Sequence, residues 1–206
     1  MNRLSINPTS QKQYILPKFH NDVENINNFL KQNNEKKVVV VQGLGFVGSV
    51  MSLVVANAFN LDFAVIGIDL PTESSYWKIC SINEGVFPIL TSDQNVEIFF
   101  NNTKSNKNLY ATCDDYAYSV ADVIVVDINL DVKKKYDNSN NLNYDVDLTS
   151  FKQAISNIAN TRAIPLTPAA SAPPLKIILI TSITANVAVN TSAHSPLSPK
   201  WKSLPR

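Results

Sequence analysis

Three glycines, Gly43, Gly45 and Gly48, constrain the fold of this chain more than any other feature of its sequence. They follow the apolar run Val38 to Val41, which is typical of a parallel strand buried on both faces. A stretch rich in Val, Leu and Ala comes next and predicts a helix from about residue 46 to residue 59. Glycines at this spacing between a strand and a helix are typical of a turn that binds the diphosphate of a dinucleotide.

Each glycine has a distinct predicted role. We expect Gly43 to allow the sharp turn out of the strand, Gly45 to allow close approach of a diphosphate, and Gly48 to allow the helix to pack on the sheet. The helix N-terminus behind them would favour negative charge. The candidate cofactor-binding turn is therefore Gly43, Leu44, Gly45, Phe46, Val47 and Gly48.

An acidic residue completes the pattern. Asp69 follows a second predicted strand, Phe63 to Ile68, about 20 residues after the glycines, where a carboxylate can accept both ribose hydroxyls of adenosine. A carboxylate there repels a 2′-phosphate, so the sequence predicts NAD rather than NADP as cofactor. The alternative is a glycine turn that binds no ligand.

The remaining pattern predicts the α/β class, as a Rossmann-like doubly wound parallel sheet with an N-terminal helical arm and a poorly ordered C-terminal tail. Further strands are expected at Leu109 to Thr112, Asp122 to Asp127 and Leu175 to Ile183. Residues 1–19 are interpreted as an extended arm. A helix over residues 21–32 is expected to lie outside the nucleotide fold, against the edge of the sheet or a second subunit.

Three segments are therefore predicted: an arm and helix (1–35), an NAD-binding domain (36–159) and a Pro-rich tail (160–206). The tail has no Asp, Glu or Gly and holds seven of the eleven prolines, which is typical of a disordered segment or of a wrong reading frame. Residues 131–145 are expected to form a mobile loop near the cofactor. Its three lysines, Lys133 to Lys135, are interpreted as solvated surface rather than as a phosphate clamp.

Composition excludes several classes of function. A formal net charge of +1 gives no general attraction for nucleic acid or for an anionic membrane. Two cysteines, Cys80 and Cys113, and two distant histidines do not suggest a disulfide framework or a metal site. With no leader sequence and no long apolar run, the sequence predicts a soluble cytoplasmic protein, and homodimerisation stays open.

Four blocks resemble the N-terminal domain of the UDP-glucose/GDP-mannose dehydrogenase family, the NAD-dependent nucleotide-sugar 6-dehydrogenases. Two of them, Gly43 to Gly48 and Val65 to Asp69, occur in many dinucleotide-binding proteins. The block Ile82-Asn-Glu-Gly-Val-Phe-Pro-Ile89 is more particular to this family. The fourth joins Ala121 to Val126 with the helix start Asp147 to Phe151. The resemblance covers about residues 36–159.

The resemblance implies NAD as cofactor and, for a complete enzyme, oxidation of the C6 alcohol of a UDP- or GDP-sugar to the uronic acid, a step of polysaccharide biosynthesis. That chemistry needs two hydride transfers and a nucleophilic cysteine. Cys80 and Cys113 do not match its position and are interpreted as inert core thiols, so no catalytic residue is assigned. A nucleotide sugar would be a substrate only if the missing half were supplied.

The sequence also departs from the family pattern. Where the family has a Pro-Thr-Pro turn, this chain has Asp127-Ile-Asn-Leu-Asp131, and the later Thr-Val-Pro-Pro-Gly-Thr segment has no counterpart. The leading hypothesis is a cofactor-binding half that is truncated or frameshifted. The alternatives are a stand-alone NAD-binding, sensing or interaction module, and a methyltransferase or other enzyme with a similar glycine turn.

Overall fold

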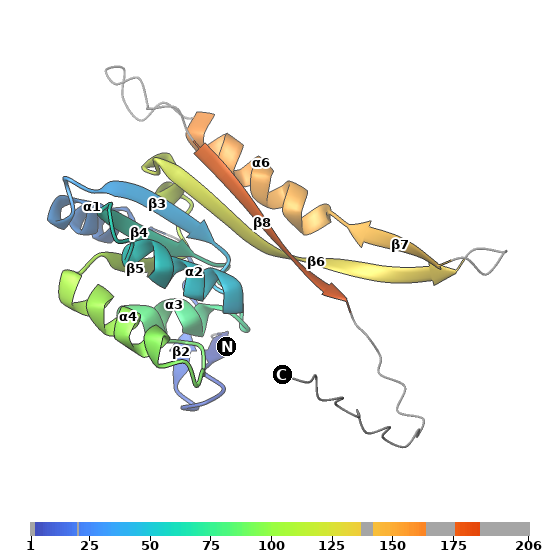
Figure 1. Cartoon of the computed structure of the whole chain (residues 1–206), viewed down its shortest axis with the longest axis horizontal. Helices are drawn as coiled ribbons and strands as arrows, with labels where there is room; N and C mark the ends of the chain where they lie inside the picture. The colour runs from blue at the N-terminus through green and yellow to red at the C-terminus, as the bar shows by residue number, and fades with distance from the viewer. Residues whose placement is uncertain (1–2, 20, 137–141, 164–175, 186–206) are drawn as a thin grey trace, which may run out of the picture.

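The computed structural model describes residues 3–19, 21–136, 142–163 and 176–185. Within them, one sheet carries helices on both faces, and a small two-stranded sheet lies at the N-terminus (Figure 1). The strands are β1 (Leu4–Ile6), β2 (Gln13–Ile15), β3 (Lys37–Gln42), β4 (Phe63–Ile68), β5 (Leu109–Thr112), β6 (Val123–Tyr136), β7 (Leu142–Asp147) and β8 (Lys176–Ala185). The helices are α1 (Val23–Gln32), α2 (Phe46–Ala56), α3 (Tyr76–Asn83), α4 (Gln94–Asn106), α5 (Tyr116–Ser119) and α6 (Thr149–Ala163).

The main sheet has the strand order β5, β4, β3, β6, with β7 and β8 both paired to β6. All neighbouring pairs are parallel except β6 with β7. The order reverses between β3 and β6, so that β3 lies at the centre of the sheet. The predicted doubly wound parallel sheet is confirmed, including the strand at β8.

The helices cover the two faces of the sheet as its buried strands require. On one face, α1, α5 and α6 pack around Val40, Ile66 and Ile124. On the other face, α2 packs on Val39, Val41 and neighbouring strand residues, while α3 and α4 pack beside it. The central strands are apolar throughout because both of their faces are covered.

Helix α1 belongs to the core of the main fold, unlike the prediction that placed it outside. Its side chains Ile26 and Phe29 are buried on the face of the sheet, and Phe29 stacks on Tyr110 with 5.7 Å between ring centroids. Asp22, just before the helix, accepts hydrogen bonds from the hydroxyls of Tyr110 and Thr112. Helical periodicity identifies a buried face, but it does not say what covers that face.

The N-terminal segment forms a β-hairpin instead of the expected extended arm. β1 and β2 pair antiparallel, and the hairpin is fixed to α3 through Ser5, whose hydroxyl donates to the Glu73 carbonyl and accepts from the Trp77 amide. The contacts tie residues 3–16 to the nucleotide-fold helix that follows β4. The segments 1–35 and 36–159 are therefore packed together over a shared core.

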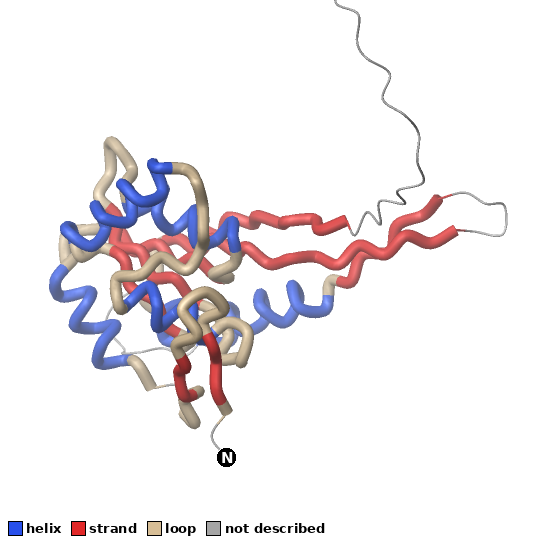
Figure 2. The backbone as a smooth tube through the Cα atoms, turned by 90° about the horizontal axis from the view of Figure 1, so that it is seen from below, coloured by secondary structure: helices blue, strands red, loops and turns tan. Residues whose placement is uncertain are grey.

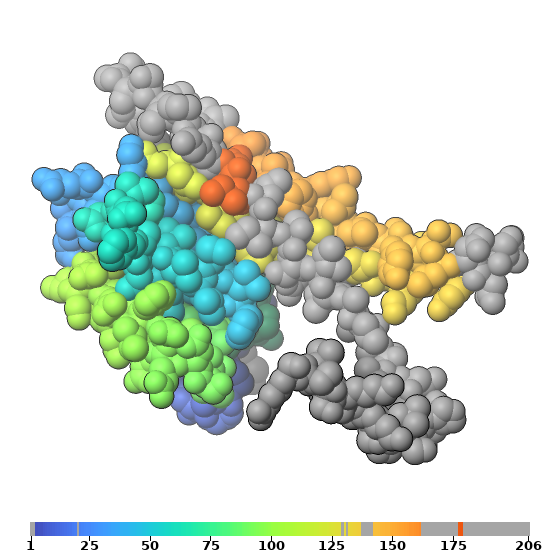
Figure 3. Space-filling model, in the orientation of Figure 1, coloured from blue at the N-terminus to red at the C-terminus, as the bar shows by residue number. Residues whose placement is uncertain are grey.

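Residues 131–145 were expected to form a mobile loop, and the part that the structure describes is instead a β-ribbon. β6 continues to Tyr136 and β7 returns beside it, with Asp131 opposite Asp147. The ribbon projects from the helical body (Figures 2 and 3). The three lysines are exposed on it, and Lys135 pairs with Asp145, in agreement with a solvated surface.

At its C-terminal end, the fold extends past the predicted boundary at residue 159. α6 runs to Ala163, and its buried Ile158 belongs to the main core. Asp147, two residues before the first helical residue, accepts a hydrogen bond from the Thr149 amide. β8 pairs with β6 along the whole strand. The prediction of a poorly ordered tail otherwise falls outside the described residues.

Candidate functional site

The glycine turn joins β3 to α2 and has two positions that exclude a side chain. Gly43 has φ +94°, and a Cβ there would lie 2.0 Å from the carbonyl oxygen of Asp127. A Cβ on Gly48 would lie 1.8 Å from the carbonyl oxygen of Gly43. The predicted roles of these two glycines, a sharp turn and close packing of the helix on the sheet, agree with this geometry.

Gly45 differs from the other two glycines because a Cβ built on it has no described atom within 4 Å beyond its chain neighbours. It is the N-cap of α2, with extended backbone angles and no side-chain capping bond. The open space therefore lies in front of a helix N-terminus, where backbone N–H groups and the helix dipole favour an anion. This geometry fits the approach of a diphosphate.

A cleft of about 760 Å³ opens in front of this turn. It lies at the carboxyl ends of the parallel strands, where the strand order reverses between β3 and β6, which is the usual place for a ligand in an open α/β sheet. Helices α2, α5 and α6 each contribute residues to its walls. The volume is within the range of small-molecule sites.

Five of the seven predicted cofactor-binding residues line this cleft: Gly43, Gly45, Phe46, Val47 and Asp69. The other two, Leu44 and Gly48, lie behind it. The Leu44 side chain is fully buried with Ile79 and Ile82, and one of its methyl groups would lie 2.7 Å from a Cβ on Gly67. Leu44 contributes its backbone to the turn, while its side chain anchors the turn to α3.

Asp69 is held in place by three groups. Its Oδ2 accepts from the Leu44 amide at 3.2 Å and lies 3.3 Å from Lys78 Nζ, while its Oδ1 accepts from the Leu70 amide at 2.8 Å. The side chains of Asp69 and Lys78 are only 14% and 19% exposed. The carboxylate is therefore oriented in the cleft before any ligand binds. Lys78 also lines the cleft. The sequence analysis did not identify it, although it lies in α3, the helix that follows Asp69.

Further residues of the cleft come from the ends of β5 and β6 and from α5. Tyr118 is buried beside Asp115 and Asp69, and burial raises the pKa of its hydroxyl well above the ordinary value. It therefore stays protonated and can donate a hydrogen bond. Asp127 is also buried and lines the cleft, as does Gln42, whose Oε1 atom is buried without a hydrogen-bond partner among the described residues. The hydrophobic periodicity of the sequence does not distinguish Tyr118, Asp127 and Gln42 from ordinary core or surface residues.

The two cysteines occupy different places. Cys113 lines the cleft, and burial, followed by the nearby Asp22 and Asp114, raises the pKa of its thiol to about 11. Cys80 is half-buried on α3, and burial raises its thiol pKa, with a smaller opposing effect of the Tyr76 hydroxyl. Both thiols are therefore protonated at neutral pH and are poor nucleophiles.

The block Ile82 to Ile89 has a structural role beside β5. The Asn83 side chain donates to the Ala111 carbonyl at 2.7 Å and accepts from the Ala111 amide at 2.9 Å, so that it continues the hydrogen bonding of the sheet at its edge. Gly85 then takes φ +77°, in the left-handed region that glycine adopts readily. The block fixes α3, and with it Lys78, relative to the sheet.

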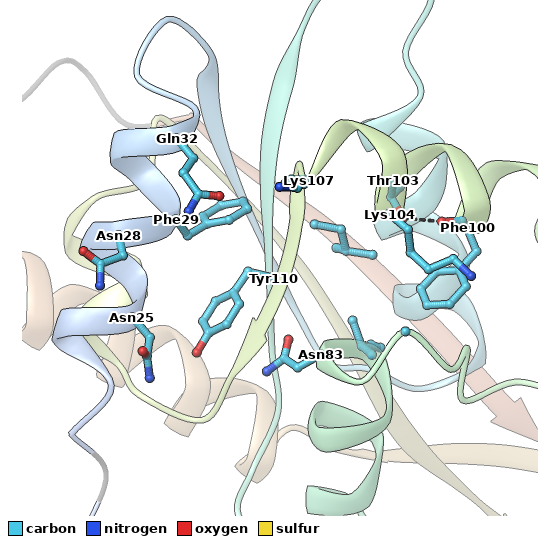
Figure 4. Close-up of a pocket in the computed structure, with 13 residues that line it drawn as sticks. Asn25, Asn28, Phe29, Gln32, Asn83, Phe100, Thr103, Lys104, Lys107 and Tyr110 are labelled. Atoms are coloured by element: carbon cyan, nitrogen blue, oxygen red, sulfur yellow. Dashed lines mark hydrogen bonds between the residues drawn. The ribbon is translucent and has the colours of Figure 1, made fainter.

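A second cavity of about 400 Å³ lies on the outer side of β5, between α1 and α4 (Figure 4). Carboxamides from α1, including Asn25 and Gln32, face Asn83 and Lys104 across it. It contains none of the residues of the glycine turn and not Asp69. The cleft at the carboxyl ends of the strands is therefore the candidate functional site.

Residues 36–166, more than half of the chain, match the family profile described as "UDP-glucose/GDP-mannose dehydrogenase family, NAD binding domain". This chain belongs to the UDP-glucose/GDP-mannose dehydrogenase family. The match contains the glycine turn, Asp69, the Asn83 block and α6. NAD is the cofactor of this family's domain. Comparison with curated protein sequences returns no match.

Solved structures of nucleotide-sugar dehydrogenases are similar to the chain. NDP-N-acetyl-D-galactosaminuronic acid dehydrogenase from Methanosarcina mazei Go1 aligns with a TM-score of 0.53 and 22% identity, over 77% of this chain and 30% of that one. UDP-D-ManNAc dehydrogenase from Pyrococcus horikoshii gives a TM-score of 0.48 and 18% identity, over 69% and 28%. UDP-glucose dehydrogenase from Pyrobaculum islandicum gives 0.47 and 14%, over 73% and 36%.

These likenesses concern the fold, and this chain spans about a third of the length of each solved chain. In the described part of this family member, no helix is long and apolar enough to cross a membrane. No group of three or more His, Cys, Asp and Glu side chains among the described residues is arranged to hold a metal ion.

Proposed function

We propose that this chain binds NAD in the cleft at the carboxyl ends of β3, β4 and β6, as the cofactor-binding part of a nucleotide-sugar 6-dehydrogenase. The observation that carries the proposal is the open N-terminus of α2 at Gly45, with the oriented carboxylate of Asp69 in the same cleft. The first suits a diphosphate and the second suits a ribose diol.

Different residues of the cleft would bind different parts of NAD. The backbone of Gly43 to Val47 would receive the diphosphate, and Gly48 would let α2 approach the sheet closely enough to present its N-terminus. Asp69 would accept the ribose hydroxyls, while the amides of Leu44 and Leu70 and the Lys78 ammonium keep it oriented. NAD, when bound, supplies a hydride acceptor.

Oxidation of a UDP- or GDP-sugar C6 alcohol is proposed for the complete family enzyme and not for these residues alone. Neither thiol of this chain is activated as a nucleophile, since burial raises both thiol pKa values. The expected activity of this chain is therefore NAD binding without turnover. A place in polysaccharide biosynthesis and in the cytoplasm follows from the same proposal, and the two free thiols are compatible with a reducing compartment.

One observation favours a second candidate, a stand-alone NAD-binding or sensing module. Where the family has a Pro-Thr-Pro turn, β6 continues as a strand through Asp127 to Asp131 and beyond. In the family, this turn faces the nicotinamide side of the site. Because β6 continues as a strand here, that end of the cleft has a different wall in this chain.

Calorimetric titration of the purified chain with NAD and NADP tests the binding proposal. We expect saturable NAD binding, weaker NADP binding, and loss of both in Gly45→Val. Absence of NAD binding by the folded protein would contradict the proposed site. NADH formed from UDP-sugars or GDP-mannose, and lost in Cys80→Ser or Cys113→Ser, would contradict binding without turnover.

A further inference from the structure

Helix α3 begins without a cap from the residue that precedes it. Ser75 occupies the N-cap position, but its side chain makes no capping hydrogen bond and bonds instead to the Leu70 carbonyl and to Thr72. The first amides of a helix have no partner within the helix. Trp77, in the first turn of α3, is buried, so its amide needs a partner from elsewhere in the protein.

The N-terminal hairpin supplies that partner. The hydroxyl of Ser5 on β1 accepts a hydrogen bond from the Trp77 amide at 2.9 Å and donates one to the Glu73 carbonyl at 2.7 Å. Ser5 is fully buried, so water cannot readily replace its hydroxyl. One side chain from a distant strand therefore joins the segment before α3 to the first turn of the helix.

Further contacts hold the hairpin against the rest of α3. The Asn7 side chain donates to the Ser81 hydroxyl at 3.3 Å, and Lys12 pairs with Glu84 at the C-terminal end of the helix. The hairpin precedes residues 36–166, so this support comes from outside the part of the chain that matches the family profile.

The first turn of α3 carries Lys78, which follows Trp77 directly. Lys78 Nζ lies 3.3 Å from Asp69 Oδ2, and the same oxygen accepts a hydrogen bond from the Leu44 amide of the glycine turn. The position of the first turn of α3 therefore determines whether Lys78 reaches Asp69. Ser5 is thus linked to the candidate site through two adjacent residues of α3 and one ion pair.

We propose that Ser5 is a positioning residue of the cofactor site, which orients Asp69 through the first turn of α3 and Lys78. This inference rests on the NAD-binding function proposed above. Without the Ser5 hydroxyl, the Trp77 amide and the Glu73 carbonyl lose their shared partner, so the turn opens and Lys78 no longer holds Asp69. A less oriented carboxylate must then be ordered when the ribose binds, which weakens the binding.

A purely structural role of the hairpin would give a different result. Loss of the Ser5 hydroxyl would then lower the stability of the fold, and any effect on NAD affinity would be the same whichever residue stands at position 78. A double-mutant cycle between Ser5 and Lys78 separates the two roles, because it measures whether the two effects add.

The experiment measures NAD binding by calorimetric titration of the unmodified chain, Ser5→Ala, Lys78→Met and the double variant. Thr9→Ala is the control, since Thr9 is exposed in the turn of the same hairpin. Circular dichroism confirms that each variant is folded. Ser5→Cys, which keeps the size of the side chain and bonds only weakly, replaces Ser5→Ala if the latter is not folded.

The first turn of α3 can also be observed without a ligand. Trp77 and Trp201 are the two tryptophans of the sequence, so Trp201→Phe leaves the emission of Trp77 alone. In that background, Ser5→Ala should shift the emission to longer wavelength and increase its quenching by acrylamide, because the turn opens to solvent. Thr9→Ala should change neither. Unchanged Trp77 emission in Ser5→Ala would overturn the capping role of Ser5.

We expect Ser5→Ala and Lys78→Met each to weaken NAD binding by about fivefold, and the double variant to bind no more weakly than Lys78→Met. Thr9→Ala should resemble the unmodified chain. With the unmodified chain binding NAD, unchanged affinity in either folded single variant, or losses that multiply in the double variant, would overturn the role of Ser5 alone. Absence of NAD binding by the folded unmodified chain would overturn the NAD site and this inference with it.

Discussion

Lys78 Nζ lies 3.3 Å from Asp69 Oδ2, and this pair is mostly shielded from solvent in the wall of the candidate site. In the proposed NAD site, the carboxylate that would accept the ribose hydroxyls therefore has a cation beside it. This arrangement matters for cofactor choice, because the acid disfavours a 2′-phosphate and the neighbouring cation would favour one. We therefore expect the discrimination between NAD and NADP to depend on both side chains.

Replacing Asp69 by Ala should weaken NAD binding by about 1–3 kcal/mol, because the charge-assisted hydrogen bonds to the ribose are lost. The same change releases Lys78, so NADP binding should improve relative to the unmodified chain. Titration of both cofactors measures the two effects. The double variant Asp69→Ala/Lys78→Met should lose the NADP gain, and equal NAD and NADP affinity in the unmodified chain would contradict the assignment of Asp69.

Gly45→Val should abolish NAD binding with little effect on stability, whereas Gly48→Ala should lower the stability of the fold. Gly45 has open space and an extended backbone that valine can adopt, so the free energy of unfolding should change by less than about 1 kcal/mol while NAD binding is abolished. Gly48→Ala forces its Cβ onto the Gly43 carbonyl and should destabilise the fold by about 3 kcal/mol. Urea unfolding and NAD titration of the same samples check both. Undiminished NAD binding by Gly45→Val would place the diphosphate elsewhere.

Asn83→Ala should destabilise the fold by about 1–3 kcal/mol, because the amide and carbonyl of Ala111 lose their partners at the edge of the sheet. Asn83→Asp should also destabilise it, since a carboxylate oxygen would face the Ala111 carbonyl. The control is Asn102→Ala on the exposed face of α4, which should change the free energy of unfolding by less than about 0.5 kcal/mol. Similar stability of all three variants would show that the Asn83 contacts contribute nothing.

Alkylation of Cys113 should be slow at neutral pH and should keep accelerating, by about tenfold per pH unit, up to a pH of about 11. Its thiol pKa is raised to about 11, first by burial, so the protonated form dominates below that pH. At pH 8 about one molecule in a thousand carries the reactive thiolate, against about a quarter for a free cysteine. Iodoacetamide labelling of Cys80→Ser, followed by mass spectrometry from pH 7 to 10, measures the rate.

The urea-unfolded protein serves as the control for that measurement and should react like a free cysteine. Labelling of the folded protein at the same rate as the unfolded one at pH 8 would contradict the shifted pKa. Because Cys113 lines the candidate site, saturating NAD should slow its labelling further.

The sequence predicted the centre of the fold because local chemistry determines it. Four consecutive valines, three spaced glycines and a terminal acid leave few arrangements, and β3, β4 and β5 agree with their predicted bounds to within a residue. Gly43 was predicted to allow a sharp turn, and its φ of +94° follows a backbone rule that acts within a few residues of the chain. Predictions that depend on neighbouring residues in the sequence therefore succeeded.

The parts that sequence reasoning missed depend on contacts between distant segments. Periodicity identified the apolar face of α1, but it could not show that Ile26 belongs to the same core cluster as Val40 of β3. The polar composition of residues 131–136 suggested a loop. An antiparallel ribbon that faces solvent also carries polar side chains, so composition alone does not distinguish a strand of such a ribbon from a loop. Lys78 and Asp127 join the candidate site only because β4 and β6 flank the same strand.

The course of β6 through the candidate site has a consequence for how the chain could be altered. Ile128 and Thr149 both line the cleft, although the whole ribbon of β6 and β7 lies between them in the sequence. The chain thus leaves the wall of the cleft after Ile128 and contributes to the same wall again at Thr149. In the topology of the fold, the ribbon is comparable to an insertion between two segments of that wall. A shorter connection could join those positions and leave the turn, Asp69 and the walls of the cleft where they are.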